Sequence, residues 1–405
     1  MRPIKISDRM LSVHSEIRGP LFVEAMEMQK RGINVLKLNT GNPAAFGFEL
    51  PESIRMALEG NEDKGVAYCD FKGMPDAREA ICEYHKSMGI EGVTPDDVFI
   101  GNGVSEVVSF ALLPLLNRGD EVLLPSPSYS LWGNTVSLSG ADPVFYICDE
   151  QSEWYPDIED IRSKITPNTR AIVVINPNNP TGATYPREIL QGIVDLAREH
   201  DLIIFADEIY DRLVMDGKVH TSIASLAPDL PVITMNGLSK SHCLCGYRCG
   251  WMIISGPREL TEEYRQGIVK LTSMRLCSNT LAQLVIPAAL NDMSTPRSMV
   301  SPGGRLYEQR EAAISEIAKI DGMSVVKNTA AFYIFPKLDI KKFNITSDKV
   351  FARDLLHATN ILIVPGSGFD WRTPDHFRIV MLPEANELRD AIRRMGEFLN
   401  DYKQK

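Results

Sequence analysis

The sequence of 405 residues has no apolar run of about 18 residues, the length that a helix needs to cross a lipid bilayer. Its first ten residues also lack the apolar core of a secretory signal peptide. These two absences predict a protein that is not inserted in a membrane, and we expect it to reside in the cytoplasm.

An excess of basic charge is missing as well. The chain has 43 Lys and Arg against 53 Asp and Glu, which gives a net charge of −10 with His neutral. A surface of this sign disfavours nucleic acid and anionic membranes, so we expect neither as a partner. An anionic substrate would therefore need a local cluster of arginines.

The seven cysteines do not suit a disulfide framework, because their number is odd and the chain is long. Cys243, Cys245 and Cys249 lie close together, but their spacing lacks the C-x-x-C pairs that are typical of a structural zinc site. We expect no metal there and interpret these thiols as small side chains that fill a tight loop.

The chain does contain an alternation of short apolar runs and longer amphipathic stretches. The runs are rich in β-branched residues, as strands covered on both faces must be. Stretches such as 187–200 have the periodicity of a helix. Strand–helix alternation predicts an α/β fold with a doubly wound, three-layer, mostly parallel sheet, in a large domain of residues 50–290. The expected strands are 98–100, 121–124, 144–147, 171–175, 202–205, 232–235 and 251–254.

The rest of the chain has a different texture. Three long helical patterns, at 304–319, 347–359 and 384–402, flank short apolar runs at 332–336, 361–364 and 377–381. We expect a second, smaller α+β domain made of residues 291–405, with residues 1–49 packed on it as an N-terminal arm.

Small, polar or ionisable residues follow five of the predicted strands. Ligands of open α/β sheets bind at the carboxyl ends of the strands, so these residues predict one shared site. The segments are 101–106, 125–129, 176–182, 206–210 and 236–240, and Gly246-Tyr247-Arg248 follows the last of them.

Each segment alone also has a plain structural interpretation. Gly101-x-Gly103 could be a strand-to-helix turn, or it could expose the amides of Val104 and Ser105 to a phosphate. It lacks the third glycine of a dinucleotide fingerprint, which disfavours NAD. Asp207 could be a helix N-cap, Tyr210 could be a packing residue and Lys240 could lie on the surface.

Taken together, three motifs resemble the fold-type I aminotransferases of class I/II, which depend on pyridoxal phosphate. These motifs are Asn179-Pro180-Thr181-Gly182, Asp207-x-x-Tyr210, and Ser239-Lys240 with Arg248 eight residues after the lysine. Arg18-Gly19-Pro20, Tyr68-Cys69-Asp70 and Asn236-Gly237-Leu238-Ser239-Lys240 are most similar to the alanine (glutamate–pyruvate) branch of that family.

The resemblance implies a role for each residue around the cofactor ring. Lys240 would hold the cofactor as a Schiff base and move the substrate proton, and we expect burial to lower its pKa. Asp207 would keep the ring nitrogen protonated. Asn179 and Tyr210 would bind the phenolic oxygen, and Tyr129 would stack on the ring.

The resemblance also implies how the phosphate is bound. The amides of Val104 and Ser105 and the guanidinium of Arg248 would contact it. The family commonly has a serine three residues before the lysine, where this chain has Gly237, so Ser239 is expected to substitute. Tyr68 would reach the phosphate of a partner subunit, which implies a homodimer with shared active sites.

Substrates would be small amino acids and 2-oxo acids. Arg378 is expected to bind the α-carboxylate, with Gly41, Asn179 and Tyr129 also in contact with the substrate. Arg18 is expected to bind the distal carboxylate of glutamate. The preferred reaction converts alanine and 2-oxoglutarate to pyruvate and glutamate.

Three alternatives remain open from the sequence. The chain could act on other amino acids, such as aspartate or aromatic ones. It could be a pyridoxal-phosphate carbon–sulfur β-lyase, because the same cofactor site serves many reactions. A transcription regulator with an aminotransferase-like domain is disfavoured, because such proteins need a DNA-binding module and this chain begins almost directly with the Arg18-Gly19-Pro20 arm.

Overall fold

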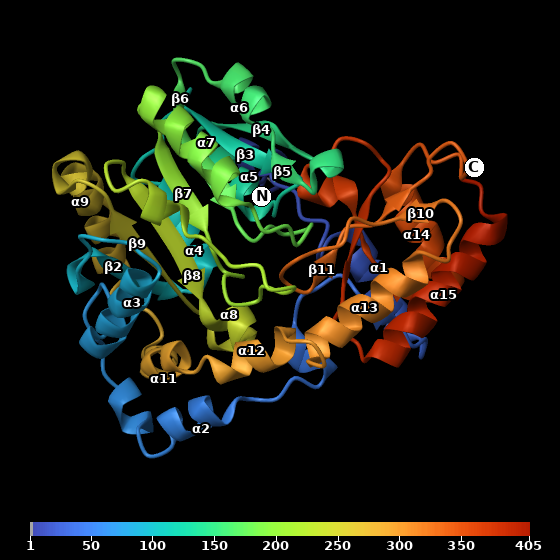
Figure 1. Ribbon diagram of the computed structural model, residues 1–405, viewed down its shortest axis with the longest axis horizontal. Coiled ribbons are helices and arrows are strands. Elements are labelled where there is room, and N and C mark those ends of the chain that lie inside the picture. The colour runs from blue at the N-terminus through green and yellow to red at the C-terminus, as the bar shows by residue number, and fades with distance from the viewer. Residues whose placement is uncertain (1–2) are drawn as a thin grey trace.

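A computed structural model describes residues 3–405. Its centre is an eight-stranded sheet (Figure 1). The strands, in order across the sheet, are β2 (Val98–Asn102), β9 (Cys249–Ser255), β8 (Val232–Gly237), β7 (Ile203–Asp207), β6 (Thr169–Ile175), β3 (Glu121–Ser126), β4 (Asp142–Asp149) and β5 (Tyr155–Pro156).

Most of these strands run in one direction, which confirms the predicted mostly parallel α/β fold. β8, β7, β6, β3 and β4 pair in parallel, while β9 is antiparallel to β8 and β5 is antiparallel to β4. β2 is antiparallel to β9, so it runs with the main group. The carboxyl ends of β2, β3, β6, β7 and β8 therefore all lie at the same edge of the sheet.

Helices cover both faces of the sheet, and β6 shows why its residues 171–175 are all apolar. Ile172 and Val174 pack on one face with α3 (Pro75–Ser87), α6 (Ile158–Lys164) and α7 (Arg187–Glu199). Val173 and Ile175 pack on the other face with α4 (Val104–Leu112), α5 (Leu131–Leu138) and α9 (Arg258–Arg275). A strand buried on both sides has no position for a polar side chain.

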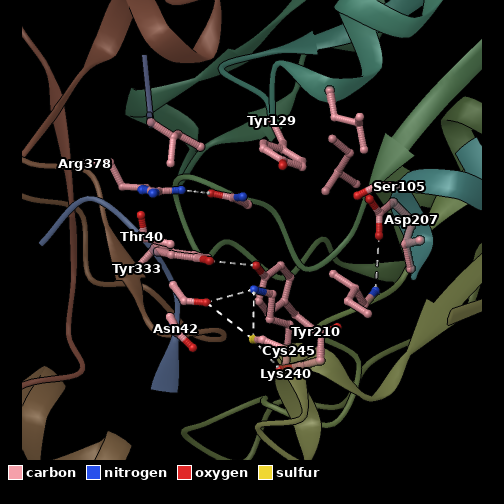
Figure 2. A pocket seen from close by; sticks show the side chains of 18 of the residues that line it. Thr40, Asn42, Ser105, Tyr129, Asp207, Tyr210, Lys240, Cys245, Tyr333 and Arg378 are labelled. Carbon is pink, nitrogen blue, oxygen red and sulfur yellow. Dashed lines mark hydrogen bonds between the residues drawn. The ribbon is translucent and has the colours of Figure 1, made fainter. Parts of the chain in front are cut away.

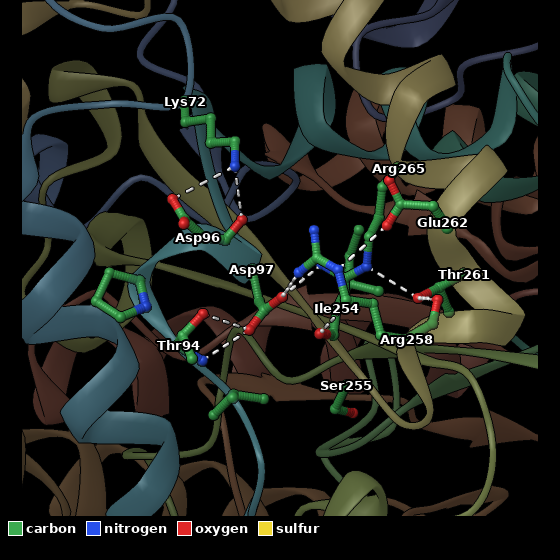
Figure 3. A network of polar contacts seen from close by, with 12 residues as sticks. Lys72, Thr94, Asp96, Asp97, Ile254, Ser255, Arg258, Thr261, Glu262 and Arg265 are labelled. Atoms are coloured by element: carbon green, nitrogen blue, oxygen red, sulfur yellow. Dashed lines mark hydrogen bonds and ion pairs between the residues drawn. The ribbon is translucent and has the colours of Figure 1, made fainter.

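A buried ion pair ties the edge of the sheet to α9 (Figure 3). Arg265 binds Asp97 at 2.6 Å and also donates to the carbonyl of Ile254 in β9. Thr94 donates its backbone amide and its hydroxyl to the second carboxylate oxygen. Because both charges have partners, these contacts offset the desolvation penalty of burying the pair at the start of β2.

The remaining elements form a second group beside the sheet (Figure 1). Here β1 (Leu36–Lys37) pairs in parallel with β13 (Ile361–Leu362), so the first part of the chain lies against the last part. β15 (Phe377–Val380) lies between β11 (Tyr333–Ile334) and β14 (Val364–Pro365), and β10 (Met323–Ser324) pairs with β12 (Lys337–Leu338). The helices of this group are α1 (Pro20–Lys30), α13 (Arg305–Ile317), α14 (Asp348–Thr359) and α15 (Ala385–Asp401).

Short helices connect the two groups. They are α2 (Glu52–Leu58), α10 (Thr280–Leu284), α11 (Ile286–Asn291) and α12 (Ser294–Val300), and α8 (Leu238–Ser241) follows β8 directly. Within residues 3–405 no helix is both long and apolar enough to cross a membrane.

Candidate active site

A cavity of about 590 Å³ opens at the carboxyl edge of the sheet, between the two groups of elements (Figure 2). Of the residues predicted to bind cofactor or substrate, all but Tyr68 line it. Those that do are Arg18, Gly41, Val104, Ser105, Tyr129, Asn179, Asp207, Tyr210, Ser239, Lys240, Arg248 and Arg378. They come from segments far apart in the chain, which the fold brings together at one place.

Lys240 lies in α8, one short turn after the end of β8, and its amine points into the cavity. The Nζ atom donates to the backbone carbonyl of Gly41 at 3.1 Å and lies 3.9 Å from the Sγ atom of Cys245. The lysine is therefore not a surface residue, and its amine can reach a ligand in the cavity.

The pKa of the Lys240 amine differs from the expectation based on the sequence. Burial does lower the pKa of its amine, but the nearby Tyr333, Cys245 and Tyr129 raise it, and the net pKa lies above the usual value. The predicted lowering is therefore wrong for the chain by itself. The sequence could not show this, because Tyr333 and Tyr129 reach the lysine from distant segments.

Asp207 is the last residue of β7 and is buried. Its carboxylate accepts hydrogen bonds from the indole nitrogen of Trp132 at 3.2 Å and from the amide of Ile209 at 3.3 Å. Burial raises its pKa to about 6, and these two donors oppose that rise. A turn and not a helix follows directly after Asp207, so the N-cap interpretation is wrong.

Tyr210 and Tyr333 form a buried pair of phenols. Their hydroxyl oxygens are 3.0 Å apart, and both residues are 2 % exposed. Tyr333 belongs to β11, so this contact joins the large sheet to the second group of elements. Gly41 is required beside it, because a Cβ atom there would lie 2.2 Å from the Tyr333 hydroxyl oxygen.

Arg378 is 1 % exposed and extends from β15 into the cavity (Figure 2). It donates to the side-chain oxygen of Asn179 at 3.0 Å and to the carbonyl of Asn39. The rings of Tyr333 and Phe369 lie 4.4 Å and 4.6 Å from its guanidinium carbon. Each Nη atom carries a second N–H group beyond these two contacts, so the guanidinium retains donors for a ligand.

The start of α4 has the form of an anion site. Val104 and Ser105 are the first two residues of this helix, where amides have no carbonyl partner within the helix. The preceding Gly103 has φ +82, and a Cβ atom there would lie 2.4 Å from the guanidinium of Arg248. Glycine thus leaves Arg248 free to lie beside the helix terminus, where an anion is favoured.

The glycine at position 237 also has a packing reason. A Cβ atom on Gly237 would lie 2.6 Å from the carbonyl oxygen of Cys249, in the neighbouring strand β9. A serine therefore does not fit at this position without movement of the backbone. Ser239, two residues later, lines the cavity.

The N-terminal arm lies over the mouth of the site. Its backbone exchanges two hydrogen bonds with Asn134 in α5, and the His14 ring pairs with Asp370 at 3.2 Å. The Asp370 carboxylate raises the pKa of His14. This docking brings Ile17 and Arg18 to the cavity, with Arg18 still exposed.

Tyr68 is 79 % exposed and is separated from the cavity of its own chain. It lies on a surface with the exposed apolar side chains of Val66, Met274, Leu276 and Leu281. The segment with Val66 and Tyr68 meets the segment with Leu276 and Leu281 through a hydrogen bond. The hydroxyl of Thr280 donates to the carbonyl of Gly65 at 2.7 Å.

Sequence reasoning missed several residues of the site. The apolar run at 332–336 predicts a strand for Tyr333 but no role in the site, and none of the motifs includes Trp132. Thr40, Asn42 and Cys245 also line the cavity. Thr40 and Asn42 offered a signal, because they are polar and flank Gly41. Tyr333 and Trp132 offered none, because an aromatic side chain in an apolar run is usually a core residue.

The lysine and the buried carboxylate at the edge of the mostly parallel sheet, with the buried arginine facing them from β15, form a polar site where open α/β sheets bind their ligands. The sequence matches the model of the family "Aminotransferase class I and II" over residues 33–395. The chain belongs to this family and is an aminotransferase.

Individual relatives cover the whole chain. It is 50 % identical over 404 residues to the glutamate-pyruvate aminotransferase AlaA of Haemophilus influenzae, with 100 % of both chains covered. The crystal structure of an aminotransferase from Escherichia coli superimposes with a TM-score of 0.98, at 48 % identity and with 100 % of both chains covered. An alanine aminotransferase from Pyrococcus furiosus has a TM-score of 0.92, at 40 % identity, covering 98 % of this chain and 100 % of that one.

Proposed function

We propose that the protein transfers the amino group of alanine to 2-oxoglutarate through pyridoxal phosphate, forming pyruvate and glutamate. The convergence of Lys240, Asp207 and Arg378 in one cavity carries this proposal. The choice of substrates is supported by similar chains that are named glutamate-pyruvate or alanine aminotransferases.

The residues of the cavity fit this cofactor. Gly103 leaves a cradle between Arg248 and the start of α4 that suits a phosphate. The buried Asp207 has only neutral hydrogen-bond donors, so a protonated ring nitrogen would stabilise its charge. Asn179 and Tyr210 would bind the phenolic oxygen, Tyr129 would stack on the ring and Ser239 would contact the phosphate.

Pyridoxal phosphate would supply an aldehyde that binds amines and a ring that withdraws electrons from the substrate α-carbon. Lys240 would bind the aldehyde between turnovers and move the proton of the α-carbon during turnover. Arg378 would bind the α-carboxylate through two parallel hydrogen bonds and so orient the substrate. Arg18 is the candidate for the distal carboxylate of glutamate.

Substrate assays test the reaction. Alanine with 2-oxoglutarate should give pyruvate at a much higher kcat/KM than aspartate or aromatic amino acids give their oxo acids. Cystathionine should release no thiol. Rapid thiol release with slow pyruvate formation would instead indicate a carbon–sulfur β-lyase.

The role of Lys240 has a separate test. Borohydride reduction and peptide mapping should place a pyridoxyl group on Lys240, and Lys240→Ala should fold but not complete transamination. A label on Lys37 or Lys72 would overturn the assignment of the cofactor lysine.

The active form is proposed to be a cytoplasmic homodimer in which Tyr68 completes the phosphate site of the partner. The exposed apolar surface around Tyr68 supports this, because large exposed apolar side chains that gather in one place suit an interface. All seven cysteines are free, as is usual in a reducing compartment. We also retain residues 50–290 as the large domain and residues 1–49 with 291–405 as the small domain, which the pairing of β1 with β13 supports.

A further inference from the structure

A thiol and an amine face each other inside the cavity. The Sγ atom of Cys245 lies 3.9 Å from the Nζ atom of Lys240, and both atoms contact the same carbonyl oxygen, that of Gly41, at 3.6 Å and 3.1 Å. The roles proposed above for the cavity residues leave Cys245 without a function. Figure 2 shows the two side chains side by side at one end of the cavity.

The loop between them holds this arrangement in place. The chain turns back after α8, where the amide of Leu244 bonds to the carbonyl of Leu238 at 3.2 Å. The Cys245 thiol bonds to the carbonyl of Ser239 at 3.0 Å, and Arg248 donates to the carbonyl of Cys245 at 2.9 Å. Hydrogen bonds on both sides of Cys245 therefore hold the thiol beside the lysine.

The long side chain of Lys240 has several rotatable bonds and is only partly buried. Small rotations can therefore close the gap to the sulfur without movement of the backbone. The cavity also admits small molecules, so a small oxidant can reach Cys245.

We propose that Cys245 and Lys240 form a reversible oxidative crosslink, a sulfur–nitrogen bond made when a hydroperoxide oxidises the thiol while the lysine amine is free. The crosslink occupies the nitrogen that the proposed function assigns to the cofactor, so it switches the enzyme off. The effect of substrate on the crosslink rests on the proposed function, in which Lys240 binds the cofactor. The formation of the crosslink itself does not.

The chemistry balances in two steps. Hydrogen peroxide transfers an oxygen atom to the Cys245 thiol, which gives a sulfenic acid and one water. The neutral amine of Lys240 then attacks the sulfur and displaces hydroxide, which leaves as a second water with a proton from the amine. The sulfur is oxidised by two electrons and the peroxide is reduced to two waters. A small dithiol reverses the reaction by taking the place of the nitrogen on sulfur and then forming its own disulfide.

This chemistry predicts when the enzyme is sensitive. Lys240 cannot react while its nitrogen is bound to the cofactor, but an amino donor without an oxo acid releases it. Alanine alone should therefore make the holoenzyme more sensitive to hydrogen peroxide than the holoenzyme without substrate. The pKa of Lys240 is raised, so the reaction should also speed up between pH 7 and pH 9, because only the neutral amine attacks.

Mass spectrometry of the peroxide-treated holoenzyme tests the inference. With alanine present, the polypeptide should lose the mass of two hydrogen atoms, trypsin should fail to cut after Lys240, and a dithiol should restore both the mass and the activity. Inactivation should be at least tenfold faster with alanine than without substrate. Oxygen addition on Cys245 with normal cleavage after Lys240 would overturn the proposal.

Two variants act as a matched pair. Cys245→Ala should lose no activity on peroxide treatment relative to its own untreated rate, whereas Cys243→Ala, which removes a thiol two residues away, should crosslink like the unchanged protein. Crosslinking in Cys245→Ala would overturn the assignment. Protein stripped of cofactor separates the two proposals: if it crosslinks but alanine does not sensitise the holoenzyme, the crosslink stands and Lys240 is not the cofactor lysine.

Discussion

The environment of Asp207 disfavours the charge that the proposed reaction needs. Burial raises the pKa of its carboxyl to about 6 from an ordinary value of 3.8. A carboxyl with a raised pKa costs stability as it ionises, so this cost grows as the pH rises from about 4 to about 6 and is complete above that range. The difference between the two pKa values corresponds to about 3 kcal/mol.

Asp207→Asn should therefore stabilise the protein when cofactor has been removed. At pH 8 the free energy of unfolding should rise by up to about 3 kcal/mol, and at pH 4 by less than about 1 kcal/mol. With cofactor present, turnover of the variant should fall by roughly a hundredfold or more, because an amide cannot keep the ring nitrogen protonated. Urea unfolding at the two pH values and steady-state kinetics measure both effects.

The comparison with Asp211→Asn, in the same turn, serves as the control for Asp207→Asn. Asp211 accepts hydrogen bonds from Tyr84 at 2.5 Å and from Asn236 at 2.7 Å. Its amide variant should show no pH-dependent gain in stability. A pH-independent gain in Asp207→Asn, or near-normal turnover, would contradict the role given to Asp207.

Arg18→Ala should separate the two amino acids of the reaction. If Arg18 binds the distal carboxylate, kcat/KM for glutamate should fall by the equivalent of about 2–4 kcal/mol, while the value for alanine changes little. Arg9, exposed in the same arm, offers the matched substitution: Arg9→Ala should leave both values unchanged. Equal losses for alanine and glutamate in Arg18→Ala would make Arg18 a structural residue.

The identities of the candidate residues were more predictable than their surroundings. Lys240, Asp207 and Arg378 stand at strand ends or in motifs that the sequence displays. Tyr333 and Trp132 contact them from segments that carry only an apolar pattern, so their roles depend on tertiary packing. The pKa of Lys240 was mispredicted for the same reason.

The turn from β2 into α4 depends on a single glycine. Gly103→Ala should weaken binding of pyridoxal phosphate at least tenfold, because the new Cβ atom would displace the guanidinium of Arg248. Gly119 has a similar φ of +90 with no atom within 4 Å of its would-be Cβ. Gly119→Ala should thus cost only about 1–2 kcal/mol of stability and leave cofactor affinity unchanged. Fluorescence titration measures the affinity, and equal affinity losses in both variants would contradict this account.

Most strands could be predicted because residues such as those of β6 must be apolar on both faces. The direction of β9 could not be predicted, since an apolar run carries no sign of whether its neighbours are parallel. The two-residue strands β1 and β13 were also beyond prediction in their pairing, because the two segments that meet are far apart in the chain. The assignment of cofactor and substrate contacts, and the division into domains, stay predictions.

The exposed apolar surface around Tyr68 predicts the state of the protein in solution. Sedimentation velocity should show a dimer, and Met274→Glu should shift it toward monomer and lower activity, because a charge would be buried at the interface. Val219 is 81 % exposed but lies outside this surface, so Val219→Glu should remain dimeric and active. A monomeric, fully active unchanged protein would refute the shared site.

The pairing of Leu36 with Ile361 sets an order on biosynthesis. The ribosome makes the N-terminal strand early, and its partner leaves the exit tunnel only after nearly all of the chain is complete. At about 5–20 residues per second, the delay is on the order of 15–65 seconds. Throughout that interval the nascent chain carries Leu36 and Leu38 without the strand that they pair with in the finished fold.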